Sequence, residues 1–169
     1  LYRALELSDT DRAKAASYEA LAKAFSRIGD KEQYFNYAAE YYNAIDRLGD
    51  RATAFDRANQ AYFLGEMYSV REDEYQAYHA YARAAQLYTD PFMRTEALLP
   101  MARYNLKEKN KELAATQARE IADLLPDQGW RVSDAASILS RAGRKDQAIE
   151  VLRRAIDRKP FDNATLYKD

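Results

Sequence analysis

The sequence predicts an all-helical fold built from antiparallel helix hairpins. The 169 residues include only five glycines and four prolines, which fall at intervals and not in clusters. Apolar side chains recur at spacings of three and four residues, the period of one helix face, and no stretch shows the alternation of a strand. The length favours one domain that is long enough to bury a core.

The first hairpin is expected at residues 11–49. A helix over 11–28 has an apolar stripe that includes Leu21 and Phe25, and Gly29 supplies the left-handed residue that ends it. Asp30 follows as the N-cap of a second helix over 31–48, with Gln33 as its capping-box partner. Two helices joined by about two residues must lie antiparallel.

Three further hairpins follow the same arrangement. Helices are expected over residues 51–70, 74–88, 91–107, 111–125, 129–142 and 145–158. Asp73 caps the second of them, and Asp90 places Pro91 at the first position of the third. Pro126 and Pro160 end two of the others, as prolines beyond helix ends do. We therefore expect a single domain over 1–169, with approximate units 11–49, 50–90, 91–126 and 127–160.

The fourth and second units carry the most specific repeat pattern. The fourth has glycine at the turn, then a small residue, a large apolar residue, alanine and proline at fixed spacing: Gly143, Ala148, Leu152, Ala155 and Pro160. The second has Leu64, Gly65 and Tyr68 in the order Leu-Gly-x-x-Tyr. The chain therefore resembles the tetratricopeptide repeat (TPR) family. That resemblance implies a right-handed superhelical array, or α-solenoid; a helical hairpin array of another family is the alternative.

Both ends of the sequence carry partial repeats. Residues 4–7 resemble the end of a preceding second helix, and residues 162–167 are suited to begin another. Because the chain also begins with Leu1 and not with methionine, we expect it to be a piece of a longer array.

The composition excludes several kinds of site. The absence of cysteine and a single histidine, His79, leave almost no thiolate or imidazole chemistry, so we expect no enzyme, metal site or cofactor. A net charge of −1 lacks the basic excess that binds nucleic acid. Direct membrane insertion is not expected either, because no apolar run approaches the length of a span. Arginines and lysines near the C-terminus fit helix C-termini better than a basic patch for an acidic partner.

The resemblance implies a binding role for the concave face, which the first helix of each hairpin lines. Carried over position by position, that face comprises Glu19, Lys23, Arg27, Asn59, Tyr62, Glu66, Glu96, Arg103, Lys107, Trp130, Ser133, Ser137 and Arg141. The family's best-known peptide mode uses lysine and asparagine to clamp a C-terminal carboxylate. Glu19, Lys23, Tyr62 and Glu66 stand at the corresponding places, so that clamp is absent.

The aromatic residues allow two interpretations. The 14 tyrosines fit a packed core, with Tyr37, Tyr62, Tyr75 and Tyr78 the candidates for an exposed binding surface. Trp130 is expected to pack between hairpins, and a ligand-facing indole is the alternative.

These features predict a non-catalytic scaffold that binds a protein or peptide partner, with a glycan as a further candidate ligand. One specific form is the periplasmic TPR region of a bacterial outer-membrane secretion or polysaccharide-export protein; a cytoplasmic location is the alternative. A glycan-processing enzyme built on Glu19 and Glu66 is less favoured.

Overall fold

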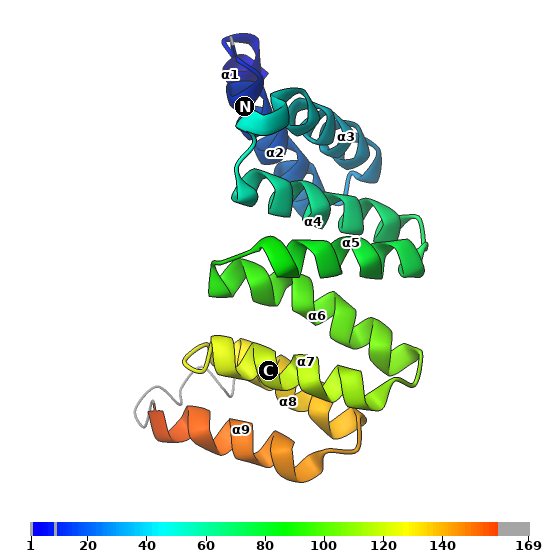
Figure 1. Ribbon diagram of the computed structural model, residues 1–169, viewed down its shortest axis with the longest axis vertical. Helices are drawn as coiled ribbons and strands as arrows, with labels where there is room; N and C mark the ends of the chain where they lie inside the picture. Colours follow the sequence, from blue (N-terminus) through cyan, green and yellow to red (C-terminus); the bar gives the residue numbers. More distant parts are fainter. Residues whose placement is uncertain (1, 9, 159–169) are drawn as a thin grey trace. The chain divides into compact units, whose positions relative to one another are not determined.

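The computed structural model describes residues 2–8 and 10–158, and every regular element in this part of the chain is a helix (Figure 1). The helices are α1 (Tyr2–Glu6), α2 (Asp11–Ile28), α3 (Lys31–Leu48), a 3-10 turn (Gly49–Arg51), α4 (Ala54–Val70), α5 (Glu74–Leu87), α6 (Pro91–Lys107), α7 (Lys111–Leu124), α8 (Gly129–Arg141) and α9 (Lys145–Arg158). No helix among the described residues is both long and apolar enough to cross a membrane.

The predicted helix boundaries are largely confirmed, because the capping residues act as expected. Gly29 has a φ of 77° and ends α2, and the Asp30 carboxylate accepts the Gln33 backbone N–H at 3.1 Å. The Asp73 and Asp90 carboxylates cap α5 and α6 in the same way. Satisfying a free N–H group of the first turn helps to fix where α3, α5 and α6 begin.

The start of α4 differs from the prediction by three residues. Residues 49–51 form a 3-10 turn, and Thr53 makes a reciprocal capping box with Asp56, so the α-helix begins at Ala54 and not at Arg51. The hydroxyl and the carboxylate each satisfy a backbone N–H of the other residue. Pro160 and the helix expected over 162–167 lie outside the described residues.

The helices pair in sequence order within two compact units. The N-terminal unit (1–88) contains the hairpins α2–α3 and α4–α5, with α3 also packed on α4. The C-terminal unit (89–169) contains α6–α7 and α8–α9, and there α8 packs against both α6 and α7. Each hairpin is visible as two neighbouring ribbons in Figure 1.

Small residues lie where helices cross closely, and large ones fill the remaining core of the N-terminal unit. Ala22, Ala38 and Ala84 have no exposed surface, while Tyr41 and Phe63 pack ring to ring at 4.9 Å between centroids. Gly65 of α4 faces the ring of Tyr81 on α5 so closely that a Cβ there would lie 2.7 Å from it. The glycine of the Leu-Gly-x-x-Tyr pattern therefore permits the close approach of α4 and α5.

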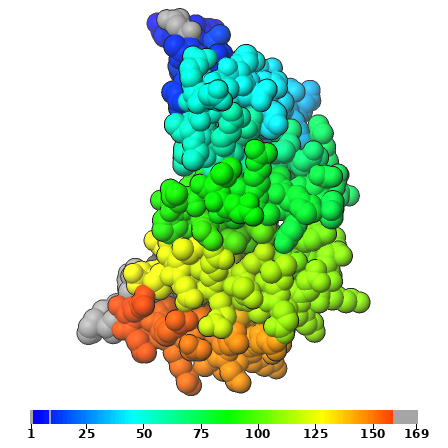
Figure 2. Space-filling view, in the orientation of Figure 1, coloured from blue at the N-terminus to red at the C-terminus, as the bar shows by residue number. Residues whose placement is uncertain are grey.

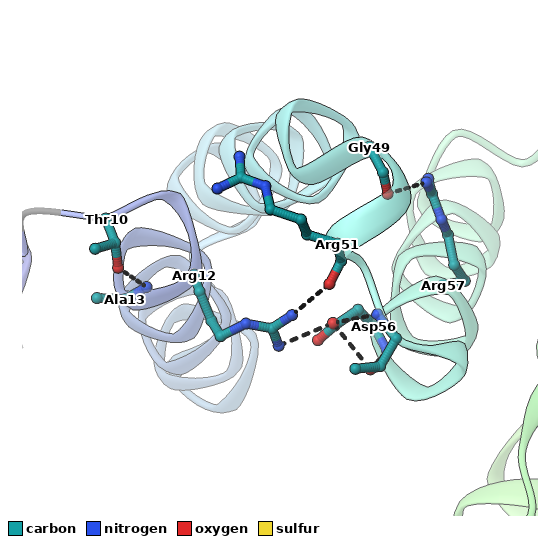
Figure 3. Close-up of polar contacts among 8 residues, drawn as sticks. Thr10, Arg12, Ala13, Gly49, Arg51, Asp56 and Arg57 are labelled. Atoms are coloured by element: carbon teal, nitrogen blue, oxygen red, sulfur yellow. Dashed lines mark hydrogen bonds and ion pairs between the residues drawn. The ribbon is translucent and has the colours of Figure 1, made fainter.

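Arg12 ties the first hairpin to the second (Figure 3). Its guanidinium donates to the Asp56 carboxylate at 2.9 Å and to the Arg51 carbonyl at 2.8 Å. Arg57 donates to the Gly49 carbonyl at 2.8 Å from the other side of the same turn. Two arginines thus hold the turn that precedes α4, and its carbonyls gain charged donors.

The core of the C-terminal unit mixes alanines with a buried polar pair. Asn105 on α6 donates to the side-chain oxygen of Gln117 on α7 at 2.9 Å, and both residues are buried. A buried amide pair that satisfies itself specifies how two helices align. Pro100 lies inside α6, which continues through it to Lys107.

Candidate partner-binding site

The first-helix residues of the first hairpin are partly exposed on α2. Lys23 and Arg27 are exposed, and Glu19 is partly buried. The Lys23 ammonium lies 2.6 Å from the Glu19 carboxylate, one helical turn away. Such an i, i+4 pair contributes only about 0.3–0.5 kcal/mol to folding, and the Lys23 side chain remains exposed to solvent.

Asn59 of α4 is not on an open surface. Its side chain is 3% exposed and accepts a 2.6 Å hydrogen bond from the Tyr88 hydroxyl. Its amide nitrogen lies 3.5 Å from the Glu19 carboxylate, to which it donates. Asn59 therefore connects the core of α4 to the charged edge of α2.

Glu66 of α4 lies among tyrosines. Its carboxylate accepts a 2.9 Å hydrogen bond from the Tyr34 hydroxyl, and a second one comes from Tyr62. Burial raises the pKa of Glu66 because desolvation disfavours the charged form, and these hydrogen bonds and the Lys23 charge offset only part of that. Burial also raises the pKa of Tyr34, with the negative charge of Glu66 as the next cause.

A raised carboxyl pKa is one of the marks of a catalytic acid, so it bears on the glycan-processing alternative. Two features favour a structural role for Glu66 instead: its carboxylate is already held by Tyr34, and the ring of Tyr62 packs edge-on against Tyr81 at 5.5 Å. Glu66 therefore is a partly buried residue of α4 whose carboxylate is held by α3 through Tyr34.

The C-terminal unit brings charged and aromatic residues of α6 and α8 together. Arg131, which the sequence did not mark, is 4% exposed and forms an ion pair with Glu96 of α6. Its guanidinium lies 3.8 Å from the centroid of the Trp130 ring and 5.7 Å from that of Phe92. Cation–π contact and the Glu96 carboxylate together compensate the buried charge.

The Trp130 and Phe92 rings over this arginine are open to solvent. Trp130 is 51% exposed and Phe92 is 43% exposed, and the two rings meet edge-on at 6.3 Å. The Trp130 indole N–H donates to the Gln128 side chain at 3.3 Å. Trp130 thus contacts Phe92 of the preceding hairpin but is not buried there, because about half of its surface stays exposed.

The remaining predicted residues lie on α6 and α8. Arg103 is exposed and lies 3.7 Å from Asp134, which also contacts Arg131. Ser133 and Ser137 are exposed and line a groove on the other side of α8, shared with α9. Lys107 and Arg141, at the ends of α6 and α8, are exposed as well.

Four of the described tyrosines lie in the buried core, and most of the others are partly buried. Tyr34, Tyr41, Tyr81 and Tyr88 are buried. Among the candidates for exposure, Tyr75 is 61% exposed and packs edge-on against His79, whereas Tyr37, Tyr62 and Tyr78 are partly buried.

The structure assembles one cluster of predicted residues within each unit. The first cluster, in the N-terminal unit, contains Glu19, Lys23, Asn59, Tyr62 and Glu66. The second contains Glu96, Trp130 and Arg103, linked through Arg131 and Asp134. Phe92, Arg131, Tyr34 and Tyr88 complete these clusters, and none of the four is among the residues that the sequence predicts for the binding face.

Comparison with known proteins supports the fold. No family model matches the chain, and no curated protein matches it in sequence. Among solved structures, the crystal structure of MamA protein matches with a TM-score of 0.54 at 13% identity, over 92% of this chain and 96% of that one. MamA contains TPR repeats. The chain thus has an all-α fold of the helical-repeat, TPR-like solenoid type.

Proposed function

We propose that this protein is a non-catalytic TPR scaffold that binds a protein or peptide partner through the exposed faces of α2, α4, α6 and α8, the first helices of its hairpins. The observation that carries the proposal is the exposed aromatic pair Trp130 and Phe92, held by the buried guanidinium of Arg131. Aromatic residues are enriched among the side chains that dominate binding energies at interfaces.

The aromatic pair is already fixed in place before any partner arrives. Arg131 is anchored by Glu96 from α6 and by Asp134 from its own helix. A rigid ring loses little conformational entropy on binding, so more of its contact area contributes to affinity. Arg103, 3.7 Å from Asp134, adds an exposed cation beside the rings. This combination fits an extended segment with an apolar or aromatic residue next to a carboxylate.

The N-terminal unit would contribute the exposed charges of Lys23 and Arg27, whereas Asn59 and Glu66 would act by holding α4 in place. Membership of the TPR family is part of the proposal, supported by the Gly65 contact and by the likeness to MamA. The absence of cysteine also fits the periplasmic form of this scaffold, because an oxidising compartment would pair free thiols.

A peptide-display selection against the whole protein tests this function. Selected peptides are synthesised, and their affinity for the wild type is compared with that for Trp130→Ala and for Arg103→Glu combined with Arg141→Glu. Leu113→Ala on α7 is the matched control, because Leu113 is equally an exposed apolar side chain at 43% but lies on a second helix.

We expect Trp130→Ala to weaken binding by about tenfold or more, the loss typical of an aromatic anchor, with the control unchanged. Peptides that bind both Trp130→Ala and the double arginine variant as strongly as the wild type would refute the role of this face. Carbohydrate arrays run in parallel would show whether a glycan occupies it instead.

A further inference from the structure

Two pairs of aromatic rings have almost the same geometry but different surroundings. Phe55 of α4 and Phe92 of α6 both lie at the second position of their helix. Phe55 meets the ring of Tyr88 edge-on, at 6.1 Å between centroids and 62° between planes. Phe92 meets the ring of Trp130 at 6.3 Å and 63°. The two pairs belong to different units, so each can be judged against the other.

Packing explains the pair in the N-terminal unit, because Tyr88 is 2% exposed and its hydroxyl donates to Asn59. The pair in the C-terminal unit is not explained in this way, since both of its rings are about half exposed. In Figure 2 the yellow atoms of the segment that leads into α8 lie at the molecular surface. Two large rings that stay exposed side by side, Phe92 and Trp130, offer a partner a preformed contact area.

The polar groups beside these rings indicate which hydrogen bonds a ligand can make. The indole N–H of Trp130 donates to the exposed side chain of Gln128 at 3.3 Å, a long hydrogen bond that a ligand carbonyl can replace. The carboxylates of Glu96 and Asp134 are both engaged by Arg131. The site thus offers a donor, while its acceptors are already occupied. A matching ligand carries hydrogen-bond acceptors and few donors.

A proline-rich segment has this combination of properties. Proline has a backbone carbonyl but no N–H, so no donor loses its partner when the segment lies on apolar rings. The polyproline II conformation is already extended before binding, so little conformational entropy is lost. An alanine-rich segment would place backbone N–H groups against the rings, and sugar hydroxyls would need acceptors as well as donors. Aromatic surfaces that bind polyproline II segments use the same complementarity.

An exposed cation indicates what stands next to the prolines. The Arg103 side chain is 59% exposed, and its guanidinium lies 3.7 Å from Asp134, which is too far for a hydrogen bond. Asp134 follows Trp130 on α8 by four residues, about 6 Å along the helix axis. Two residues of polyproline II also span about 6 Å. A carboxylate two residues from a proline on the rings therefore meets Arg103 and complements its charge.

We propose that Phe92 and Trp130 bind a proline-rich segment in the polyproline II conformation, with an acidic residue two positions from the bound proline. A pyrrolidine ring packs on the two aromatic rings, and the indole N–H donates to a carbonyl of the segment. The acidic side chain pairs with Arg103. This inference rests on the proposed scaffold function and names the chemical class of its partner at the C-terminal unit.

Three labelled peptides of equal length test the proposal on the whole protein by fluorescence anisotropy. The first is a run of prolines with an aspartate two positions beyond each end, so that it can bind in either direction. The second has lysines in place of the aspartates, and the third has alanines in place of the prolines. We expect the first peptide to bind at least about tenfold more tightly than either of the others, because the second has the wrong charge and the third lacks the preformed conformation.

Variants locate the binding, with circular dichroism to check that each one folds. Phe92→Ala and Trp130→Ala should each weaken the first peptide by about tenfold, whereas Trp130→Phe, which keeps a ring but loses the indole donor, should weaken it by about fivefold. Arg103→Gln should narrow the preference for aspartate over lysine. The matched control is Phe55→Ala, because Phe55 is also 51% exposed at the second position of its helix but lies beside the buried ring of Tyr88. Its binding should equal that of the wild type.

Several outcomes would overturn the proposal: failure of the first peptide to bind, equal binding of the first peptide and either of the others, and a loss in Phe55→Ala as large as in Trp130→Ala. The peptide-display selection separates this inference from the proposed function. Selected peptides that lack proline but still depend on Trp130 would leave the scaffold function in place and refute the proline-rich class. Selected peptides that are indifferent to Trp130 would refute both, and a glycan that displaces the first peptide would refute a proline-rich partner.

Discussion

Replacing Gly65 by alanine should destabilise the protein, although alanine is the better helix former. Gly65 lies in the middle of α4, where exchanging glycine for alanine ordinarily stabilises a helix by about 1 kcal/mol. Here the new Cβ would lie 2.7 Å from Cδ1 and 2.8 Å from Cε1 of Tyr81. Ordinary van der Waals contact begins near 3.4 Å, so the ring or the helix must move by more than half an ångström.

The Tyr81 ring has little room to move. It is 6% exposed, packs edge-on against Tyr62 at 5.5 Å and hydrogen-bonds Ser69 through its hydroxyl. Overpacking of this kind costs about 1–3 kcal/mol. Subtracting the gain in helix propensity leaves a net loss of about 1 kcal/mol in the free energy of unfolding.

Urea denaturation followed by far-ultraviolet circular dichroism measures this change. A loss of about 1 kcal/mol lowers the urea midpoint by about 0.5 M for a typical dependence on denaturant. Tyr81→Ala removes the ring, so in that background Gly65→Ala should become stabilising. An increase in stability on Gly65→Ala alone would refute the close-approach reasoning, as would the same effect in both backgrounds.

Three further changes test the polar contacts. Arg12→Ala should lower the free energy of unfolding by about 0.5–1 kcal/mol. It should also raise the pKa of Asp56 in an NMR titration. Burial raises that pKa, but hydrogen bonds from Thr53 and Arg12 hold it below 3.8. The lowered pKa of Asp56 stabilises the folded protein above pH 3.8, and this stability is lost as the pH falls through the pKa of Asp56 in the folded state. Between these two pH values, Arg12→Ala should therefore lose less stability than the wild type. Glu66→Gln should be neutral or stabilising at pH 7, because a raised carboxyl pKa makes folding less favourable as the pH rises above 4.5; a strongly destabilised variant would contradict this. Tyr88→Phe should cost about 1–3 kcal/mol in urea denaturation because it removes the 2.6 Å hydrogen bond to buried Asn59, and an unchanged midpoint would show that another donor replaces it.

The helices are predictable from the sequence because local signals place their ends. Gly29, Asp30, Asp73 and Asp90 act on neighbouring backbone groups, and the structure confirms each of them. The beginning of α4 is missed since Thr53 and Asp56 form their capping box only after a 3-10 turn. The Leu-Gly-x-x-Tyr pattern likewise identifies Gly65, because all three residues of the pattern lie on the same helix, α4.

The site is less predictable because its residues meet across helices. In the sequence Arg131 is an ordinary arginine of α8, and its burial is explained only by Glu96 and Phe92 of α6 together with the neighbouring Trp130. The sequence predicts Asn59 on the binding face, but the structure buries it, with a hydrogen bond from Tyr88, 29 residues further along the chain. Helical periodicity indicates which face a residue occupies, but it does not tell which faces become covered.

The distribution of aromatic residues over the two units makes the chain its own spectroscopic reporter. The one tryptophan lies in the C-terminal unit, whereas all tyrosines except Tyr104 and Tyr167 lie within residues 1–88. Indole emission during denaturation therefore follows residues 89–169, while the near-ultraviolet tyrosine signal follows chiefly residues 1–88. Coincident curves would mean that the whole chain unfolds cooperatively as one domain, and separated curves would yield the stability of each half without cutting or labelling the protein.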